Sequence, residues 1–170
     1  MKVDAGGTTR LLSRDEAVAL VAEYRARAST IVFTNGVFDL LHIGHVRYLE
    51  AARALGDLLI VGLNGDVSVR RNKGPARPIT PQAERAEILL GLSSVDAVVV
   101  FDEDTPAEII AAVQPDVLVK GADWAADRIV GRDTVEARNG RVVRIPLEAG
   151  HSTTAIVDRV RAAARASRQT

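Results

Sequence analysis

The feature that most constrains the fold is an alternation of short apolar, β-branched segments with helical patterns along the chain. The apolar segments cover residues 31–34, 58–63, 97–101, 116–120 and 141–145. Short strands that are buried on both faces have this composition, and strands that alternate with helices form parallel sheets with helices on both sides. The pattern therefore predicts an α/β fold, a Rossmann-like, doubly wound, five-stranded parallel sheet.

Capping signals place the helices between these segments. Ser13 and Glu16 have the spacing of a capping box ahead of a helix that we expect to reach about Ala28. Thr80-Pro81 and Thr105-Pro106 open two more helices, and Ser152 caps a last helix to about Ala166. The remaining expected helices cover residues 44–55 and part of 127–138, and the helices opened at Thr80 and Thr105 end near residues 92 and 115.

The length of 170 residues fits one domain. We expect a flexible N-terminal arm over residues 1–12, because it is rich in Gly and Thr, and a single folded domain over residues 13–170. With 47% hydrophobic and 26% charged residues, the composition is that of an ordinary globular domain.

Charge and cysteine content exclude several classes of protein. The 22 basic and 22 acidic side chains cancel, so the basic surface of a nucleic-acid-binding protein is not expected. The chain has no Cys, which excludes disulfides and thiolate metal sites. The apolar segments are too short to span a membrane, and the first residues lack the apolar core of a secretory signal. We therefore expect a cytoplasmic protein with neither nucleic-acid nor membrane partners.

The segment from Thr34 to His45, at the end of the first predicted strand, is the richest in chemistry. In an open parallel sheet, ligands bind beyond the carboxyl ends of the strands. His42 and His45 lie three residues apart across the start of a helix, and Gly44 between them allows a ligand to approach the backbone. A helix N-terminus with two imidazoles is suited to a polyphosphate. The structural alternative is that one histidine is a core residue and the other a helix cap. A zinc site is the other alternative, but it would lack a third ligand nearby.

A basic, breaker-rich segment supplies further positive charge. Residues 70–78 read Arg-Arg-Asn-Lys-Gly-Pro-Ala-Arg-Pro, which we interpret as a long functional loop. Phosphoryl transfer spreads negative charge over several oxygens, so Lys73 is the candidate cation that closes over the phosphates, with Arg77 and Arg85 as supports. The alternative for Lys73 is a solvated loop lysine.

Two further strand ends carry candidate residues. Lys120-Gly121-Ala122-Asp123-Trp124 combines a flexible glycine with an aromatic ring that suits a base or a sugar. Ser152-Thr153-Thr154 opens the last helix and offers hydroxyls and free amides. A turn with a half-buried Trp and a simple Ser cap are the structural alternatives.

The motifs His42-Ile43-Gly44-His45 and Ser152-Thr153-Thr154 resemble the signatures of the His-x-Gly-His nucleotidyltransferases. Within that superfamily the chain is similar to the heptose 1-phosphate adenylyltransferases over roughly residues 17–162. The similarity rests on residues 34–39, 73–78, 101–106 and 115–121 as well. Class I aminoacyl-tRNA synthetases share the first motif but need a much longer chain.

The resemblance implies a nucleotidyltransferase fold and roles for individual residues. It assigns catalysis to His42, His45 and Lys73, and it adds ATP as co-substrate with Mg²⁺ but no protein metal ligands. The residues that it places around the nucleotide are Thr34, Asn35, Gly36, Phe38, Gly44, Lys120, Gly121, Asp123, Ser152, Thr153 and Thr154. Those placed around the sugar phosphate are Asp39, Asn64, Arg77 and Arg85.

The implied activity joins ATP and D-glycero-D-manno-heptose 1-phosphate into ADP-heptose and pyrophosphate, for lipopolysaccharide or another surface glycan. The resemblance also implies a homodimer and a separate heptose kinase in the same pathway. Asp123-Trp124 is similar to the glycerol-3-phosphate cytidylyltransferases, so a cytidylyltransferase is the first alternative. A nucleotide-binding module without turnover is the second.

Overall fold

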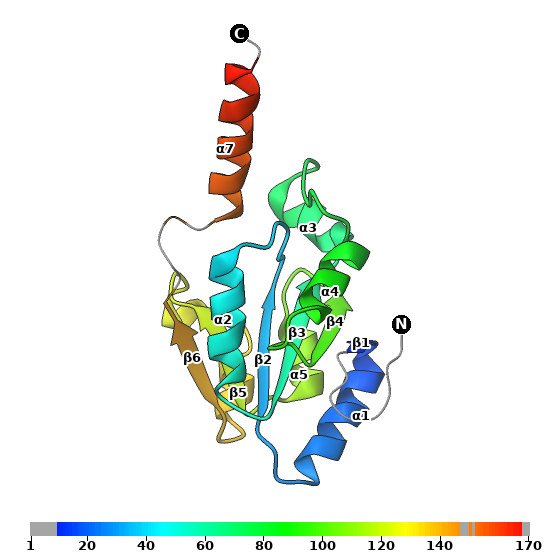
Figure 1. Cartoon of the computed structure of the whole chain (residues 1–170). Coiled ribbons are helices and arrows are strands. Elements are labelled where there is room, and N and C mark those ends of the chain that lie inside the picture. Colours follow the sequence, from blue (N-terminus) through cyan, green and yellow to red (C-terminus); the bar gives the residue numbers. More distant parts are fainter. Residues whose placement is uncertain (1–9, 147–149, 151, 168–170) are drawn as a thin grey trace.

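A six-stranded, all-parallel sheet forms the centre of the computed structural model, which describes residues 10–146, 150 and 152–167. The strands lie in the order β1-β4-β3-β2-β5-β6 (Figure 1). After β2 the chain builds one half of the sheet with β3 and β4 and then returns to add β5 and β6 on the other side of β2. Their bounds are Arg10–Leu12 (β1), Ile31–Gly36 (β2), Leu58–Asn64 (β3), Ala97–Phe101 (β4), Val117–Gly121 (β5) and Arg141–Ile145 (β6). The predicted α/β fold is confirmed, and the order reverses at β2, where ligands bind in such sheets.

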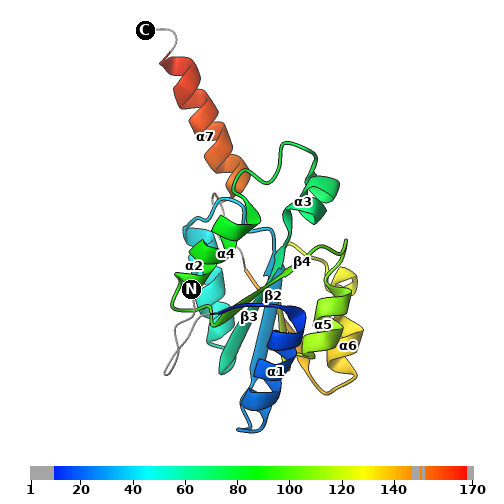
Figure 2. The ribbon, with the colours of Figure 1, turned by 90° about the vertical axis from the view of Figure 1, so that its right-hand side faces the viewer.

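Helices cover both faces of the sheet, as Figure 2 shows. Apolar side chains of α1, α5 and α6 pack on one face, and those of α2 and α4 pack on the other. The strands between them are almost entirely buried, which explains their continuous apolar composition. The helix bounds are Arg14–Arg25 (α1), Ile43–Arg53 (α2), Asp66–Lys73 (α3), Gln82–Leu90 (α4), Ala107–Val113 (α5), Arg132–Glu136 (α6) and Thr153–Ala166 (α7), with a 3₁₀ turn at Ala126–Arg128.

The sheet has six strands and not the predicted five, because residues 10–12 pair with β4 as the edge strand β1. Sequence analysis placed these three residues in the N-terminal arm. The strand is too short to show an alternation, and Leu11 is 56% exposed, so neither face gives an apolar signal. Residues 1–9 of the expected arm lie outside the described residues.

The predicted basic loop is wrong in its first half, because Asp66–Lys73 forms the helix α3. Only Ser68 and Val69 of this helix are buried, so its sequence carries almost no helical apolar pattern. The helix ends at Gly74, whose φ of 89° lies in the left-handed region that favours glycine. Lys73 is therefore held at a helix C-terminus, and only residues 74–81 form the connection to α4.

The capping predictions had mixed outcomes. Ser13 and Glu16 form both bonds of the predicted capping box, and the Ser152 hydroxyl accepts from the Ala155 amide. At the other two sites Pro81 and Pro106 occupy the N-cap position itself, with no side-chain cap bond, so the threonines before them are not caps. The first helix ends at Arg25, three residues earlier than predicted.

The last helix, α7, projects from the body of the domain (Figures 1 and 2). None of its side chains is buried, and Val160 is largely exposed. Only its N-terminal end borders the cavity described below. Among the described residues, no helix is long and apolar enough to cross a membrane.

Candidate active site

A cavity of about 730 Å³ opens at the carboxyl ends of the strands. The ends of β2, β3 and β5, the segment after β4 and the N-terminus of α7 contribute residues to its lining. The predicted site residues that line it are Asn35, Gly36, Phe38, Asp39, His42, Gly44, His45, Asn64, Lys73, Arg77, Lys120, Asp123, Ser152, Thr153 and Thr154. Segments that are far apart in sequence thus meet at one edge of the sheet, as the topology requires.

The two histidines of the His-x-Gly-His motif stack on one another at the start of α2. Their ring centroids are 3.8 Å apart with an interplanar angle of 23°. His42 is the N-cap residue, and its carbonyl accepts from the amides of His45 and Val46. Because both rings line the cavity at a helix N-terminus, N–H donors and a partial positive charge face the same space.

His45 is a neutral imidazole at pH 7. Burial, and to a smaller extent the neighbouring His42, lower its pKa to about 4. The ring of Phe38 contacts His45 edge-on at 5.3 Å between centroids and limits its solvation. A neutral ring in contact with a second ring has capacity to gain a proton when an anion binds, since an adjacent negative charge raises a histidine pKa.

The loop between β2 and α2 is held in an unusual conformation. Phe38 has a φ of 46°, which is rare for a residue with a side chain and costs backbone energy. Its ring lies so close to Gly36 that a Cβ there would be 3.0 Å from Cε2 of Phe38. Glycine at position 36 therefore allows Phe38 to fold back toward His45 while the backbone of the loop stays open to the cavity.

Asp39 fixes the connection between α3 and α4. Its buried carboxylate accepts hydrogen bonds from the amides of Ile79 and Thr80, at 2.8 and 2.9 Å, and pairs with Arg77 at 2.6 Å. The resemblance placed Asp39 and Arg77 on the sugar phosphate. In the structure both line the cavity, but Asp39 is also the anchor that holds Arg77 and the connection against the β2–α2 loop.

The β3 and β4 side of the cavity carries polar and cationic groups. Asn64 ends β3, and Lys73 ends α3. Asn72 and Asp104 also line this side, and sequence reasoning missed both. Asp104 accepts from Arg71 at 2.9 Å, which ties α3 to the loop after β4. Asn72 lies in the basic segment 70–78 and Asp104 in the segment 101–106 that carries the resemblance, but neither was singled out as a site residue.

The β5 side is more apolar. Trp124 is 52% exposed, and Ile129 and Val130 line the same side of the cavity. Sequence reasoning missed Ile129 and Val130, which look like ordinary core residues. Lys120 donates from Nζ to Oδ1 of Asn35, across from β5 to β2. Burial lowers the pKa of Lys120 to about 8, against the opposing effect of Asp123.

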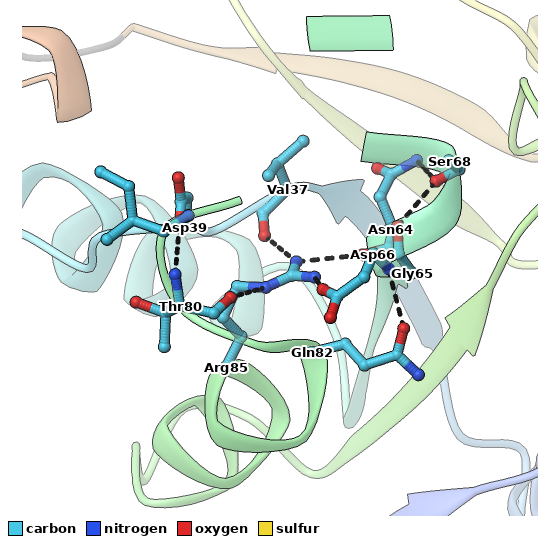
Figure 3. A network of polar contacts seen from close by, with 10 residues as sticks. Val37, Asp39, Asn64, Gly65, Asp66, Ser68, Thr80, Gln82 and Arg85 are labelled. Carbon is cyan, nitrogen blue, oxygen red and sulfur yellow. Dashed lines mark hydrogen bonds and ion pairs between the residues drawn. The ribbon is translucent and has the colours of Figure 1, made fainter. Parts of the chain in front are cut away.

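Three predicted residues do not line the cavity. Thr34 is fully buried beneath it, where its hydroxyl bonds to Tyr48 and to the carbonyl of Val119. Gly121 ends β5 just outside the lining. Arg85 has 0% exposure, and Figure 3 shows its guanidinium surrounded by acceptors.

The bonds of Arg85 join four parts of the chain. It donates to the carbonyls of Val37, Asn64 and Thr80 at 2.5, 3.0 and 2.9 Å, and it pairs with Asp66 at 2.6 Å (Figure 3). A guanidinium with all of these donors occupied in the protein interior has no capacity for substrate. In this structure Arg85 supports the site from below and does not contact its contents.

The carboxylates of the cavity show how the protein could hold the Mg²⁺ that the resemblance implies. No group of three or more His, Asp or Glu side chains suited to a metal occurs in the described part of the chain. Asp39 is held by Arg77 and Asp104 by Arg71, which leaves Asp123 as the acidic side chain best placed to receive a cation. This fits Mg²⁺ that arrives on phosphate oxygens and keeps most of its waters, as is usual for this ion.

Comparison with known proteins assigns the family. The model of the cytidylyltransferase-like family matches residues 33–159. This range includes both signature motifs and the strands β2 to β6, apart from the first two residues of β2. The chain belongs to the cytidylyltransferase-like family. This family membership confirms the resemblance to nucleotidyltransferases that the His-x-Gly-His motif indicated.

Curated relatives are similar over nearly the whole chain. A protein named bifunctional protein HldE from Syntrophotalea carbinolica is 58% identical over 136 residues, which is 80% of this chain and 28% of the relative. Its namesake from Hyphomonas neptunium is 55% identical over 90% of this chain and 32% of the relative. The chain thus spans roughly a third of the length of these relatives.

Solved structures confirm the fold. A lipopolysaccharide core biosynthesis protein from Thermoplasma volcanium is 29% identical with a TM-score of 0.58, covering 71% of this chain and 97% of that one. A pantoate-β-alanine ligase from Francisella tularensis has a TM-score of 0.56 at 12% identity, covering 83% of this chain and 67% of that one. The second similarity concerns the fold alone.

Proposed function

We propose that the protein is a sugar-1-phosphate adenylyltransferase that joins ATP and D-glycero-D-manno-heptose 1-phosphate into ADP-heptose and pyrophosphate. The observation that carries the proposal is the stacked pair His42 and His45 at the N-terminus of α2, inside a cavity with lysines on both sides. Relatives named bifunctional protein HldE and a neighbour named for lipopolysaccharide core biosynthesis support the choice of a sugar for a surface glycan.

The two sides of the cavity suit two different substrates. Trp124, Ile129 and Val130 offer an aromatic face and apolar contacts, which suit a nucleobase. On the opposite side Asn64, Lys73 and Arg77 offer amide donors and acceptors together with positive charge, which suit a phosphorylated polyol. The triphosphate would lie between them, over the histidine pair and the amides at the start of α2.

The reaction needs positioning and charge stabilisation more than proton transfer. A phosphate oxygen of the sugar attacks the α-phosphorus, the bond to the bridging oxygen of the β-phosphate breaks, and pyrophosphate leaves with the electron pair. The attacking oxygen is already anionic near pH 7, so no base is required. His42 and His45 donate N–H groups to the oxygens where charge accumulates, and Lys73 neutralises charge from the end of α3. Asp123 would be the side chain that holds a Mg²⁺ brought in by the phosphates, and this ion would supply further charge neutralisation.

The remaining ATP-site residues have supporting roles in the proposal. Asn35, Gly36 and Gly44 let the backbone approach the phosphates, and Phe38 keeps His45 in place. Ser152, Thr153 and Thr154 present hydroxyls and free amides from the start of α7. Each of these residues lines the cavity, whereas Thr34 and Gly121 support it from beneath and beside.

The test is a substrate panel scored by pyrophosphate release. The purified protein is incubated with ATP or CTP and, in turn, heptose 1-phosphate, other hexose 1-phosphates and glycerol 3-phosphate. Highest turnover with ATP and heptose 1-phosphate is the expected result. Preference for CTP and a polyol phosphate would establish the alternative, which the exposed Trp124 and the family's name favour. Nucleotide binding without pyrophosphate in any combination would leave a non-catalytic module.

The proposal extends to partners. A separate kinase must supply the sugar 1-phosphate. We also propose that the enzyme acts as a homodimer in the cytoplasm. The apolar side chains of α7, with Ile156 and Val157 partly exposed and Val160 exposed, support association between copies. Light scattering after size-exclusion chromatography measures the mass of the particle, and a monomer at working concentration would contradict the homodimer.

A further inference from the structure

Lys120 combines burial, positive charge and a neutral partner inside the cavity. It lies near the end of β5, is 7% exposed, and donates from Nζ to the side-chain oxygen of Asn35 on β2. The same Nζ lies 5.9 Å from the ring centroid of Trp124. The ammonium group is therefore fixed between the aromatic wall of the cavity and the loop that leads to the histidine pair.

The groups around Lys120 leave its charge largely uncompensated. No carboxylate among the described residues lies within ion-pair distance of its Nζ, and Asp123, from the loop after β5, acts only at longer range. From β6, Arg144 is in register with Lys120 and directs its guanidinium to the carbonyl of Ala122. On this face of the sheet, Ile110 of α5 and Ile129, which follows the 3₁₀ turn, contribute apolar side chains. A buried cation without a paired anion is costly, and a bound anion would remove that cost.

We propose that Lys120 binds the phosphate group adjacent to the nucleoside, as a second phosphate-binding cation distinct from Lys73. The inference rests on the proposed function, in which the base lies against Trp124 and the phosphates extend toward His42. Lys73 approaches the cavity from the end of α3, on the β3 side of the sheet, whereas Lys120 stands on β5 beside the base. Lys120 exchanges its bond to Asn35 for one to a phosphate oxygen when the nucleotide enters.

Nucleotide binding should then be coupled to a proton. Because the pKa of Lys120 is about 8 in the free protein, most molecules carry a neutral amine at pH 9, and a bound phosphate restores the charge. His45, with a pKa of about 4, and Tyr48, with a pKa of about 12, do not change charge between pH 7 and 10. A nucleoside monophosphate is already a dianion above pH 7, since its second pKa is about 6.

The experiment is a binding series with adenosine, AMP and ATP, measured by calorimetry at pH 7 on the wild type, Lys120→Met and Lys73→Met. Lys120→Met should leave the Kd for adenosine within about twofold and weaken AMP by about tenfold or more, as expected for a hydrogen bond to a charged group. Lys73→Met should affect ATP much more than AMP. A loss of adenosine affinity in Lys120→Met, or an unchanged Kd for AMP, would overturn the proposal, as would a wild type that binds no monophosphate of adenosine or cytidine.

Proton uptake supplies the second readout, which a merely structural role does not move. At pH 9, calorimetry in buffers of different ionisation enthalpy should show uptake of most of one proton per AMP bound by the wild type. Lys120→Met should show none, and neither should Lys120→Arg, because arginine stays charged. Uptake that persists in Lys120→Met contradicts the assignment. The binding series needs no turnover, so a wild type that gives this pattern but releases no pyrophosphate refutes the proposed function and leaves the role of Lys120 intact.

Discussion

At the scale of single residues, burial keeps one of the two histidines of the candidate site uncharged. His45 is uncharged at pH 7 because burial and His42 lower its pKa to about 4. The ring of His42 stacks on it with centroids 3.8 Å apart. His45 therefore lines the cavity at pH 7 as a neutral ring and not as a fixed charge.

Replacement of His45 by Ala should lower kcat by about 10²–10³-fold, the usual effect of removing one donor to a developing oxyanion. The melting temperature should change little, because the ring lies at the cavity surface and not in the apolar clusters of the sheet. Pyrophosphate release and a thermal melt on the same preparation measure both quantities. Near-wild-type turnover would show that the ring does not contact the reacting phosphate.

The lowered pKa of His45 also predicts an acid-sensitive fold. The unfolded state, with a pKa near 6.5, binds a proton between pH 6.5 and 4 that the folded state does not, so stability falls as the pH falls through this window. His45→Gln removes that term and should flatten the dependence. Urea unfolding of the two proteins at pH 7 and pH 5 measures it, and parallel losses in both would assign the sensitivity to other groups.

The role of a residue was predictable where a motif indicated it, and not where burial decided the role. His42, His45 and Ser152 stand in motifs, and all three line the cavity. Arg85 was predicted as a cation that supports Lys73 and contacts the sugar phosphate. Its burial was not predictable, because arginine is rarely buried and its four acceptors come from segments that only the fold brings together. Asn72 and Asp104 stand in segments that the sequence did single out, but only the fold shows that their side chains line the cavity.

Elements are joined around the cavity by buried polar anchors. Arg85 of α4 holds the β2–α2 loop, the end of β3 and the start of α3 together (Figure 3). Asp39 does the same for the connection between α3 and α4. Lys73 and Arg77 thus reach the cavity from segments that are fixed at both ends.

Arg85→Ala should reduce the free energy of unfolding by about 3–5 kcal/mol, since it leaves Asp66 and three carbonyls without their buried partner. Arg71→Ala is the matched control: it also removes an Arg–Asp pair, but an exposed one, worth about 0–1 kcal/mol. Urea denaturation of both variants gives the comparison. Equal effects would show that the buried network adds no stability.

Two serine caps provide a test of how far each helix is coupled to the fold. Ser13→Ala should cost about 1 kcal/mol of global stability, because it removes a capping box from a helix with three buried side chains. Ser152→Ala should fray α7 while the global value stays within about 0.5 kcal/mol, because no side chain of α7 is buried. Denaturation and amide exchange of α7 separate the outcomes; a global loss in Ser152→Ala would mean that α7 is packed.

Elements were predictable where their own sequence carries a β-branched or apolar run. The strands β4 and β6 begin and end where the sequence placed them, at Ala97–Phe101 and Arg141–Ile145. The edge strand β1 and the helix α3 were missed because contacts with neighbours, and not their own patterns, hold them in place. Pro81 and Pro106 took the cap positions that their threonines were expected to fill.

The molecule as a whole consists of a sheet with two covered faces and one helix that stands apart from it. The parallel sheet and its reversal at β2 follow from the alternation of strands and helices, so the fold class and the edge that carries the cavity were both predictable. The projection of α7 was not, because its amphipathic sequence is that of a helix that packs on a partner.

A chain that ends at Pro146 should keep the body of the domain intact, because α7 contributes no buried side chain. It should bind ATP more weakly, since Ser152, Thr153 and Thr154 leave the rim of the cavity. A thermal melt and a nucleotide titration of the shortened protein measure the two effects. A molten or aggregated product would show that the last helix is required for folding.

The division of the cavity between the two halves of the sheet has an evolutionary consequence. Residues 64–106 form the wall assigned to the sugar, and residues 120–130 with the start of α7 form the wall assigned to the base. Each half is a continuous stretch of sequence on its own side of β2. Recombination at β5 would therefore exchange one specificity while leaving the other untouched, and chimeras of family members would acquire new pairs of nucleotide and acceptor without any change to the shared histidine centre.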